Sequence, residues 1–394
     1  MKKKILFVDR FIEYSTEMFN ELQENVSEKK NFEIIFVGPD DKRQALFSTK
    51  NVKGAKKIWT YGKYLRKLLS YISIYKPNIV HYCFELKTYG PTLNSVIKFP
   101  LLLFLTKMKG IKIVLTFHNI FVHKQNSKWK LIDFPYETRI PFFLLKIFET
   151  IFMKLVCSLA DIIIVEADMG KLSLIEHTNV PSKKITVIPF GVSNKTRSDE
   201  IKKEKMRQKF HGKKIILNFG VISPRKSIEL IIKAFSEISE KIPEHVLVIA
   251  GKSPNEYRNY EERMRQLVRT LNMDEKIIFT GFLQDEEIDV LFEIAESVLF
   301  IYQQMGSNSS YSLFIALQHQ KPIISTNIET FHEILGKDYD SYVEVDNMSQ
   351  IADKIFQLST NAEYRNDLQN ELIEISKKFT WKAAVKKHLE IYES

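Results

Sequence analysis

The stretch KKIILNFGVISPRKSIELIIKAF, from Lys213 to Phe235, decides the fold because a strand, a loop and a helix follow one another within it. The apolar run 215–217 lies between lysines and a glycine, Gly220, as a short buried strand does. After a basic loop, apolar residues recur at helical spacing over 228–235. The stretch therefore predicts one strand-loop-helix unit of an α/β protein.

The loop of this unit carries two cations, Arg225 and Lys226. The carboxyl end of the strand, the N-terminus of the helix and both side chains would converge on one spot of the size of an anion. This arrangement predicts a diphosphate site. The alternative is that the two cations simply face water, because any α/β protein contains several such turns.

Strand-like runs alternate with longer helical or loop segments along the whole chain, which is typical of parallel sheets with helices on their faces. The polar stretch 193–214 separates two such series and predicts a domain boundary. Two doubly wound domains facing each other would leave a cleft for ligands at the carboxyl ends of their strands. The runs lie at 5–8, 32–37, 79–82, 113–117, 162–165, 185–188, 215–219, 246–250, 277–280, 297–302 and 322–325.

Length and composition support this organisation. With 394 residues the chain exceeds the size at which a single core stops growing, and 44% hydrophobic with 27% charged residues is an ordinary globular composition. Cys83 and Cys157 have no close spacing, which argues against a disulfide scaffold and favours a reducing cytoplasm. The opening MKKKILFV predicts a first strand rather than a secretory signal, and charges interrupt the longest apolar stretch, 140–160.

The net charge of +10 raises two alternatives, nucleic acid and the anionic surface of a membrane. We expect no nucleic-acid partner, because no recognised nucleic-acid-binding motif accompanies the charge. Lysines beside aromatic and aliphatic residues at 97–112 and 142–159 favour peripheral contact with an anionic membrane. Against this, the lysines could be ordinary solvated residues, and a helix that is apolar on most faces is usually buried.

Together with the stretch 213–235, the rest of the second half resembles the nucleotide-sugar domain of family 4 of the retaining glycosyltransferases, which have the GT-B fold. The similar segments include HVLVIAGKSP, in which Gly251 and Lys252 follow the strand and correspond to residues near the donor phosphates of that family. They also include KIIFTGFLQ, whose Phe282 and Leu283 lie in its base-binding loop. Gly220 and Lys226 match its phosphate-binding loop, whereas Val221 stands where many relatives carry a phosphate-binding arginine, a loss that Arg225 could offset. The family's remaining motifs are similar to LFIALQHQKPIIST and to FTWKAAVKKHLEIYES, so the motifs follow one another in the order expected for this family.

The first half resembles the same family through PNIVHYCFE and KIVLTFHN. The strand in the second segment is similar to one whose terminal histidine lies at the reaction centre of that family and contacts the transferred sugar. Here this histidine is His118. His81 and His123 are weaker candidates, because His81 could be a core residue and His123 a loop residue. The resemblance implies an N-terminal acceptor-side domain over 1–192, a nucleotide-sugar domain over 193–377, and a closing helix over 378–394 that crosses back to the first domain.

The resemblance implies a retaining transfer of a hexosyl sugar from a nucleoside diphosphate sugar, with UDP or GDP as the nucleotide, to a glycan or lipid-linked glycan acceptor in surface polysaccharide synthesis. It implies no cofactor and no metal, because GT-B enzymes neutralise the diphosphate with basic side chains and a helix N-terminus. The triplet Asp338-Tyr339-Asp340 is expected in a loop, away from any metal site. A cytoplasmic enzyme at the inner face of the cell membrane follows from this reading.

The segment YQQMGSNSSYSLFIAL departs from that family. The two glutamates that this family typically carries correspond to Ser307 and Ile315 here, and neither of these side chains is a carboxylate. A subgroup with a Ser- and Gly-rich loop implies phosphate contacts at Ser309 and Ser310, with Tyr311 in place of a glycine, and Glu333 is a candidate replacement carboxylate. The alternative function is a catalytically silent GT-B subunit or chaperone of an active partner. A GT-B epimerase or phosphorylase is a third possibility.

Overall fold

The computed structural model describes residues 2–9, 13–29, 31–39, 56–59, 63–85, 89, 93–118, 142–193, 199–303 and 309–394. The chain divides into two compact units. Unit 1 holds the described residues up to Gly191, together with Ser309 and Trp381–Ser394, and unit 2 holds the remainder, from Val192 to Thr380. These limits lie one and three residues from the boundaries expected at 192 and 377.

Unit 1 is built on a seven-stranded sheet in which every pair of neighbouring strands is parallel. The strand order is β3-β2-β1-β4-β5-β6-β7. The inner strands are nearly continuous runs of buried apolar residues, as a sheet covered on both faces requires. The strands are β1 (Lys3–Val8), β2 (Phe32–Pro39), β3 (Lys56–Trp59), β4 (Ile79–Phe84), β5 (Lys112–Phe117), β6 (Ile162–Val165) and β7 (Ile185–Val187).

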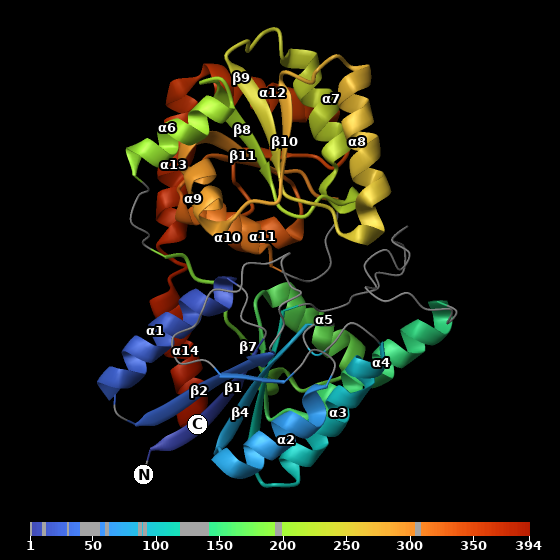
Figure 1. Ribbon diagram of the computed structural model, residues 1–394, viewed down its shortest axis with the longest axis vertical. Helices are drawn as coiled ribbons and strands as arrows, with labels where there is room; N and C mark the ends of the chain where they lie inside the picture. Colours follow the sequence, from blue (N-terminus) through green and yellow to red (C-terminus); the bar gives the residue numbers. More distant parts are fainter. Residues whose placement is uncertain are drawn as a thin grey trace. The chain divides into compact units, whose positions relative to one another are not determined.

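Helices cover both faces of this sheet (Figure 1). On one face, α1 (Glu13–Lys29) packs against α14 (Trp381–Glu393), the last helix of the chain. On the other face, neighbouring helices pack in a row, α2 against α3, α3 against α4 and α4 against α5. These four are α2 (Tyr64–Tyr75), α3 (Leu93–Lys107), α4 (Phe142–Leu159) and α5 (Asp168–Thr178), and a short 3-10 helix, η1 (Ser182–Lys184), precedes β7.

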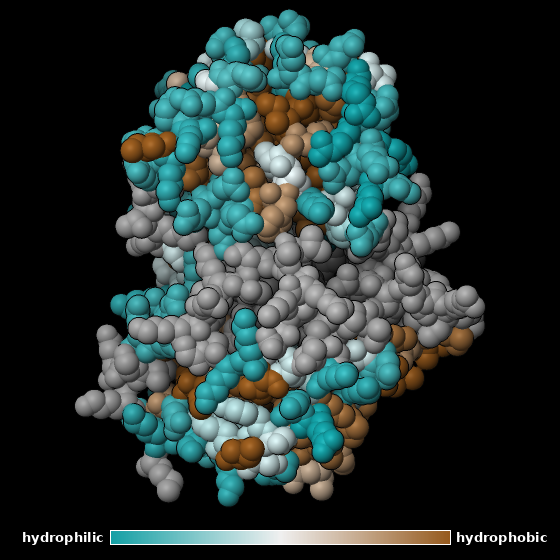
Figure 2. Space-filling view, in the orientation of Figure 1, coloured by the Kyte–Doolittle hydropathy of each residue, from teal (hydrophilic) through white to brown (hydrophobic). Residues whose placement is uncertain are grey.

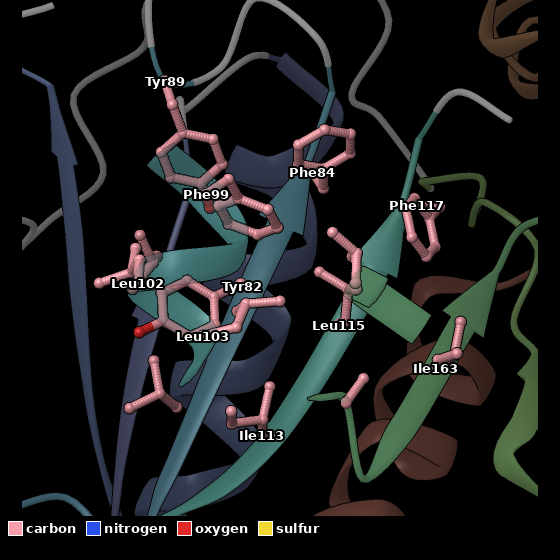
Figure 3. Close-up of a cluster of buried hydrophobic side chains, with 14 of the residues drawn as sticks. Tyr82, Phe84, Tyr89, Phe99, Leu102, Leu103, Ile113, Leu115, Phe117 and Ile163 are labelled. Carbon is pink, nitrogen blue, oxygen red and sulfur yellow. The ribbon is translucent and has the colours of Figure 1, made fainter. Parts of the chain in front are cut away.

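The core of unit 1 lies between the sheet and the α3 side (Figure 3). Tyr82 and Phe84 from β4 meet Phe99 from α3, with ring centroids 5.9 and 4.7 Å away. Leu102 and Leu103 of α3 are also fully buried in this cluster. The face of α3 that carries these residues therefore packs into the core.

Helix α14 is tied to the opposite face of the sheet by buried polar contacts. The ring of His81 in β4 lies between two hydroxyls, with Nδ1 2.6 Å from the Tyr392 hydroxyl and Nε2 2.7 Å from Oγ1 of Thr116. Nε1 of Trp381 donates to the carboxylate of Glu17 at 2.8 Å. Burial lowers the pKa of His81 well below its usual value. His81 is therefore a core residue, which was one of the alternatives for it.

Unit 2 repeats this architecture with a six-stranded parallel sheet in the order β10-β9-β8-β11-β12-β13. In both units the first strand lies inside the sheet, and the chain builds outward on one side of it before crossing to the other. This is the order of doubly wound nucleotide-binding folds. The strands are β8 (Lys214–Phe219), β9 (His245–Ala250), β10 (Ile277–Gly281), β11 (Ala295–Phe300), β12 (Ile323–Thr326) and β13 (Tyr342–Val343).

The helices of unit 2 pack in groups around this sheet (Figure 1). Helix α7 lies against α8 and α12, α6 lies against α9, and α13 contacts α10, α11 and α12. Three-residue 3-10 helices, η2 (Pro224–Lys226) and η3 (Asn255–Tyr257), precede α7 and α8. The helices are α6 (Glu200–Lys209), α7 (Ile228–Ile238), α8 (Arg258–Thr270), α9 (Asp285–Ile294), α10 (Tyr311–Gln318), α11 (Glu329–Leu335), α12 (Met348–Thr360) and α13 (Ala362–Ser376).

The predicted class, two doubly wound parallel-sheet domains, is confirmed. Two short edge strands, β3 and β13, were not predicted, and the strand expected over 297–302 is β11, which begins at Ala295 and ends at Phe300. Among the described residues, no helix combines the length and the apolar content that crossing a bilayer requires.

Candidate functional site

The candidate phosphate site lies at the point of the unit 2 sheet where the strand order reverses, between β8 and β11. Ligands of doubly wound sheets bind beyond the carboxyl ends of the strands at this point. Gly220 follows β8, and Tyr302 lies two residues after the end of β11. We call the group Gly220, Lys226, Gly251 and Ser312 the lysine seat.

The backbone of the lysine seat is built from glycines with positive φ. Gly220 has φ +122° and Gly251 has φ +141°, conformations that residues with a Cβ rarely adopt. A Cβ on Gly251 would lie 2.0 Å from the carbonyl oxygen of Gly220, so the two loops touch through their backbones. Backbone bonds from Gly220 N to Ala250 O and from Gly251 N to Gly281 O join the ends of β8, β9 and β10.

Lys226 extends back from η2 over the end of β8. Its ammonium nitrogen donates to the carbonyl oxygen of Phe219 at 3.1 Å and lies 5.1 Å from the centre of the Tyr302 ring. Only 5% of the residue is exposed, and among the described residues no carboxylate pairs with it. A buried ammonium without a counter-charge is costly. The side chain is therefore placed to receive an anion.

The N-terminus of α10 borders the same space. A Cβ on Gly220 would lie 2.1 Å from the Lys226 ammonium nitrogen and 3.2 Å from Oγ of Ser312 in the first turn of α10. Ser310 is the N-cap of this helix, but its side chain makes no capping bond. The first N–H groups of a helix have no acceptor within it and favour anions. The hydroxyl of Ser309 is buried and has no partner among the described residues.

The structure places the other predicted donor residues as follows. Arg225 is half-buried, and its carbonyl oxygen accepts from the N–H of Gln303 at 2.9 Å. The carbonyl oxygen of Lys252 accepts from Ile222, while its side chain is exposed. Phe282 and Leu283 follow Gly281 at the end of β10, next to Gly251. These residues and Tyr311, the first residue of α10, gather at the carboxyl edge of the sheet.

Four further predictions concern Glu333, the triplet Asp338-Tyr339-Asp340, the two positions of the glutamate pair and His123. Glu333 is exposed in α11, the helix after β12. The triplet Asp338-Tyr339-Asp340 lies in a turn, as expected, with the hydroxyl of Tyr339 donating to the backbone of Ile323 and Asp340 paired with Lys354. Ile315 is buried in α10. Ser307 and His123 lie outside the described residues.

A second candidate site lies at the carboxyl ends of the unit 1 strands. His118 follows β5, and its Nδ1 lies 2.6 Å from Oε1 of Glu166, which follows β6. The strand register pairs Phe117 with Val165, so the next residue of each strand is brought to the same edge. The carboxylate thus fixes the orientation of the imidazole ring.

Burial and neighbouring charges act in opposite directions on this pair. Burial disfavours the imidazolium form of His118, but Glu166, Asp9 and Glu85 outweigh burial, and the pKa of His118 is raised. Burial raises the pKa of Glu166, while His118 opposes that shift. The pair therefore holds a proton more tightly than either group would in water.

Asp9, Cys83 and His118 bring ligand atoms within 4.8 Å of one another, the one such group among the described residues that could hold a metal ion. Burial and the charges of Asp9 and Glu166 raise the pKa of the Cys83 thiol well above its usual value. A metal would have to displace the thiol proton, because the thiolate is the ligand. These three residues could therefore bind a metal ion only if the Cys83 thiol lost its proton.

His118 and Glu166 line a pocket inside unit 1, between the sheet and the helices α1 and α14. Its remaining lining is mostly apolar, with Cys83, Thr116 and His388 as the other polar groups. The apolar lining residues are Met18, Ile164, Ile188, Pro189, Phe190, Trp381 and Ala384.

Sequence reasoning missed Glu166, Tyr302 and Ser312. For Glu166 a signal was present, because it follows a buried strand directly, as His118 does, and adjacent parallel strands end at one edge. Tyr302 lies two residues after the end of β11, near the same edge of its sheet. Ser312 carried no signal of its own, since its place beside Gly220 depends on the packing of α10.

Comparison with solved structures identifies the fold. The fold matches the crystal structure of Anabaena Alr3699/HepE in complex with UDP, with a TM-score of 0.73 and 13% identity over the full length of both chains. HepE has also been crystallised with UDP-glucose. The two parallel-sheet units are those of the GT-B fold.

Residues 199–375 match the family model "Glycosyl transferases group 1", so unit 2 carries a group 1 glycosyltransferase domain. The chain is 24% identical over 231 residues to the serotype-specific mannosyltransferase WbdA of Escherichia coli, covering 56% of this chain and 27% of WbdA. It is 30% identical over 196 residues to the putative glycosyltransferase YtcC of Bacillus subtilis, covering 46% of each. The matches thus span about a quarter and about half of these relatives.

Proposed function

We propose that this protein is a metal-independent, retaining glycosyltransferase that moves a hexosyl group from a nucleoside diphosphate sugar to a glycan or lipid-linked glycan acceptor. The observation that carries the proposal is the buried Lys226 ammonium, which lies beside the N-terminus of α10 with no carboxylate partner in the described part of the chain. HepE, of the same fold, binds UDP, and WbdA is a mannosyltransferase. Surface polysaccharide assembly in the cytoplasm is the proposed setting.

The chemistry requires that the leaving group be stabilised. When the bond between the anomeric carbon and the phosphate oxygen breaks, the nucleoside diphosphate takes the electron pair. The acceptor oxygen bonds to the carbon, and its proton passes to the departing diphosphate. Lys226 and the N–H groups of α10 would stabilise the negative charge that develops on the diphosphate, because preorganised donors act most strongly in a desolvated site. Arg225 and Ser310 are proposed to contribute at the same edge.

His118 is proposed to contact the transferred sugar. Glu166 acts on it as a positioning residue, since its carboxylate accepts from Nδ1 and leaves Nε2 as the atom able to face a substrate. Phe282 and Leu283, after β10, are proposed to contact the base. Gly251 and Lys252 are proposed to lie near the phosphates, and Ser309, Tyr311 and Glu333 complete the proposed donor residues.

The test is calorimetric titration of the full chain with UDP, GDP and ADP, with and without EDTA. We expect one nucleotide to bind, with unchanged affinity in EDTA. Lys226→Met keeps the aliphatic stem and removes the charge, so it should weaken binding about 10- to 100-fold. The matched control is Lys233→Met, because Lys233 lies on α7 and pairs with Glu229. Equal affinity in both variants would contradict the proposal.

A catalytically silent GT-B subunit is the second candidate, favoured by Ile315, a buried apolar residue at a position where the resemblance implies a glutamate. Such a subunit need bind none of the three nucleotides. The same titration therefore separates the two functions.

A further inference from the structure

Helix α3 has a second apolar face that the core does not use. Phe99, Leu102 and Leu103 point into the core (Figure 3), while Ile97, Leu101, Phe104 and Met108, spaced four, three and four residues apart, are exposed. Residues at this spacing share one side of a helix. A helix that is apolar all round is normally buried on all sides.

Helix α4 shows the same pattern. Leu144, Ile147, Ile151 and Leu155 recur at helical spacing and are exposed, whereas Phe152 and Val156 are buried in the core. The two helices pack side by side, and the Lys107 ammonium joins their ends by donating to the carbonyl oxygen of Leu159 at 3.0 Å.

These eight side chains form one apolar surface, which we call the α3–α4 face. Each is 44–71% exposed, and together they are eight of the fifteen large hydrophobic side chains that are exposed in the described part of the chain. Figure 2 shows brown surface beside α3 and α4 of unit 1. Such clustering marks an interaction surface, because single exposed hydrophobic residues are otherwise scattered.

Cations border this face and carboxylates are scarce. Lys109 and Lys154 are exposed and Lys98 is half-exposed, whereas Lys107 is paired with Asp161 at 2.9 Å. Helix α3 contains no Asp or Glu, and α4 contains one, Glu149. The electrostatic partner of an apolar face with lysines around it is an apolar surface that carries negative charge.

We propose that the α3–α4 face docks on the surface of a lipid bilayer with anionic headgroups. The eight apolar side chains would enter the boundary between headgroups and acyl chains, and the lysines would contact the phosphates. A second copy of this chain fits less well, because a twofold pairing of this face would bring lysines against lysines. The proposal goes beyond glycosyl transfer and does not depend on it.

The test is co-sedimentation of the full chain with vesicles of phosphatidylcholine, with and without phosphatidylglycerol, in the absence of donor and acceptor. We expect binding that increases with phosphatidylglycerol and decreases with added salt. Ile147→Ser combined with Ile151→Ser should weaken binding about tenfold or more. Lys109→Gln and Lys154→Gln should each weaken it about fivefold.

The matched control is Ile201→Ser with Lys205→Gln, which alters an exposed isoleucine and an exposed lysine on α6 of unit 2. We expect wild-type binding for this control and unchanged thermal unfolding for all variants, because the altered side chains are exposed. Three outcomes overturn the proposal: no binding to anionic vesicles, equal binding by the Ile147→Ser/Ile151→Ser variant, or a lipid-free dimer that this variant converts to a monomer. None of them bears on nucleotide binding, so failure here is distinguishable from failure of the proposed function.

Discussion

Replacing Gly251 with alanine should damage the lysine seat more than a glycine-to-alanine change elsewhere in unit 2. The new Cβ would lie 2.0 Å from the carbonyl oxygen of Gly220 and 2.8 Å from its carbonyl carbon. Both are backbone atoms, so no side-chain rotation relieves the contact. The loop after β8 must move away from the loop after β9, or the strand ends must separate.

The magnitude follows from two contributions. The φ of +141° at Gly251 strains any residue with a Cβ by about 1–3 kcal/mol, and forcing extra volume into a packed position costs about 1–3 kcal/mol more. The matched control is Gly212→Ala, because Gly212 also has a positive φ, +67°, but no atom lies within 4 Å of its added Cβ. The control should lose about 1–2 kcal/mol and Gly251→Ala about 2–6 kcal/mol, so the middle of the two ranges gives a difference of about 2.5 kcal/mol.

Amide hydrogen exchange, read by mass spectrometry in peptides that cover β8 and β9, measures the free energy of opening in this part of unit 2. We also expect Gly251→Ala to weaken nucleoside diphosphate binding, because displacing Gly220 moves the backbone beside the Lys226 ammonium. If both variants open these strands with free energies within about 0.5 kcal/mol of each other, the close approach of the two loops does not have the energetic role assigned to it.

Two further predictions concern the buried titratable groups of unit 1. Burial lowers the pKa of His388 to about 4, so the neutral ring is favoured in the fold, and stability should decrease by about 3 kcal/mol as the pH falls from about 7 to below 4. Urea unfolding followed by fluorescence of Trp59 and Trp381, both in unit 1, should show a smaller acid loss for His388→Gln, and an equal loss would count against this account. Glu166→Gln removes the charge that raises the pKa of His118, so NMR titration of the imidazole should give a lower pKa in the variant; a pKa that stayed in place would show that other groups hold the proton.

The lysine seat was accessible to sequence reasoning because its main parts are neighbours in the chain. A strand, a glycine and two cations within 13 residues, 214–226, need only the local geometry of a strand-loop-helix unit to meet at one edge. Gly251 follows the next buried strand in the same way. The buried ammonium of Lys226 and its place beside Ser312 could not be derived, because they depend on how α10 packs across the strand ends.

The His118–Glu166 pair illustrates a different limit. The two residues are 48 positions apart, and their contact depends on the register of β5 with β6. Both strands were predicted, but nothing local in the chain states that they are neighbours, because strand order is a property of the whole sheet. The short edge strands β3 and β13 were missed for a related reason, since four and two residues are too few to show periodicity.

The exposure of the α3–α4 face could not be predicted either. Periodicity identifies the buried side of a helix only when the other side is polar, and α3 and α4 are apolar on both sides. The sequence alone therefore leaves burial and membrane contact as two alternatives for the second apolar side of each helix. The sheet decides which side packs inward, and the side that remains is exposed in this structure.

The chemistry at the two strand-order reversals supports the proposed placement of the diphosphate in unit 2, although both sheets share one topology. In unit 1 the reversal lies between β1 and β4, where Asp9 and Glu85 follow the strands. Their charges help to raise the pKa of His118, and the same negative potential would repel a diphosphate. In unit 2 the corresponding strand ends present glycines, a helix N-terminus and the Lys226 ammonium. Electrostatics thus gives the two similar folds different parts in the proposed reaction: unit 2 would attract the anionic donor, and the surroundings of His118 in unit 1 would suit a neutral sugar.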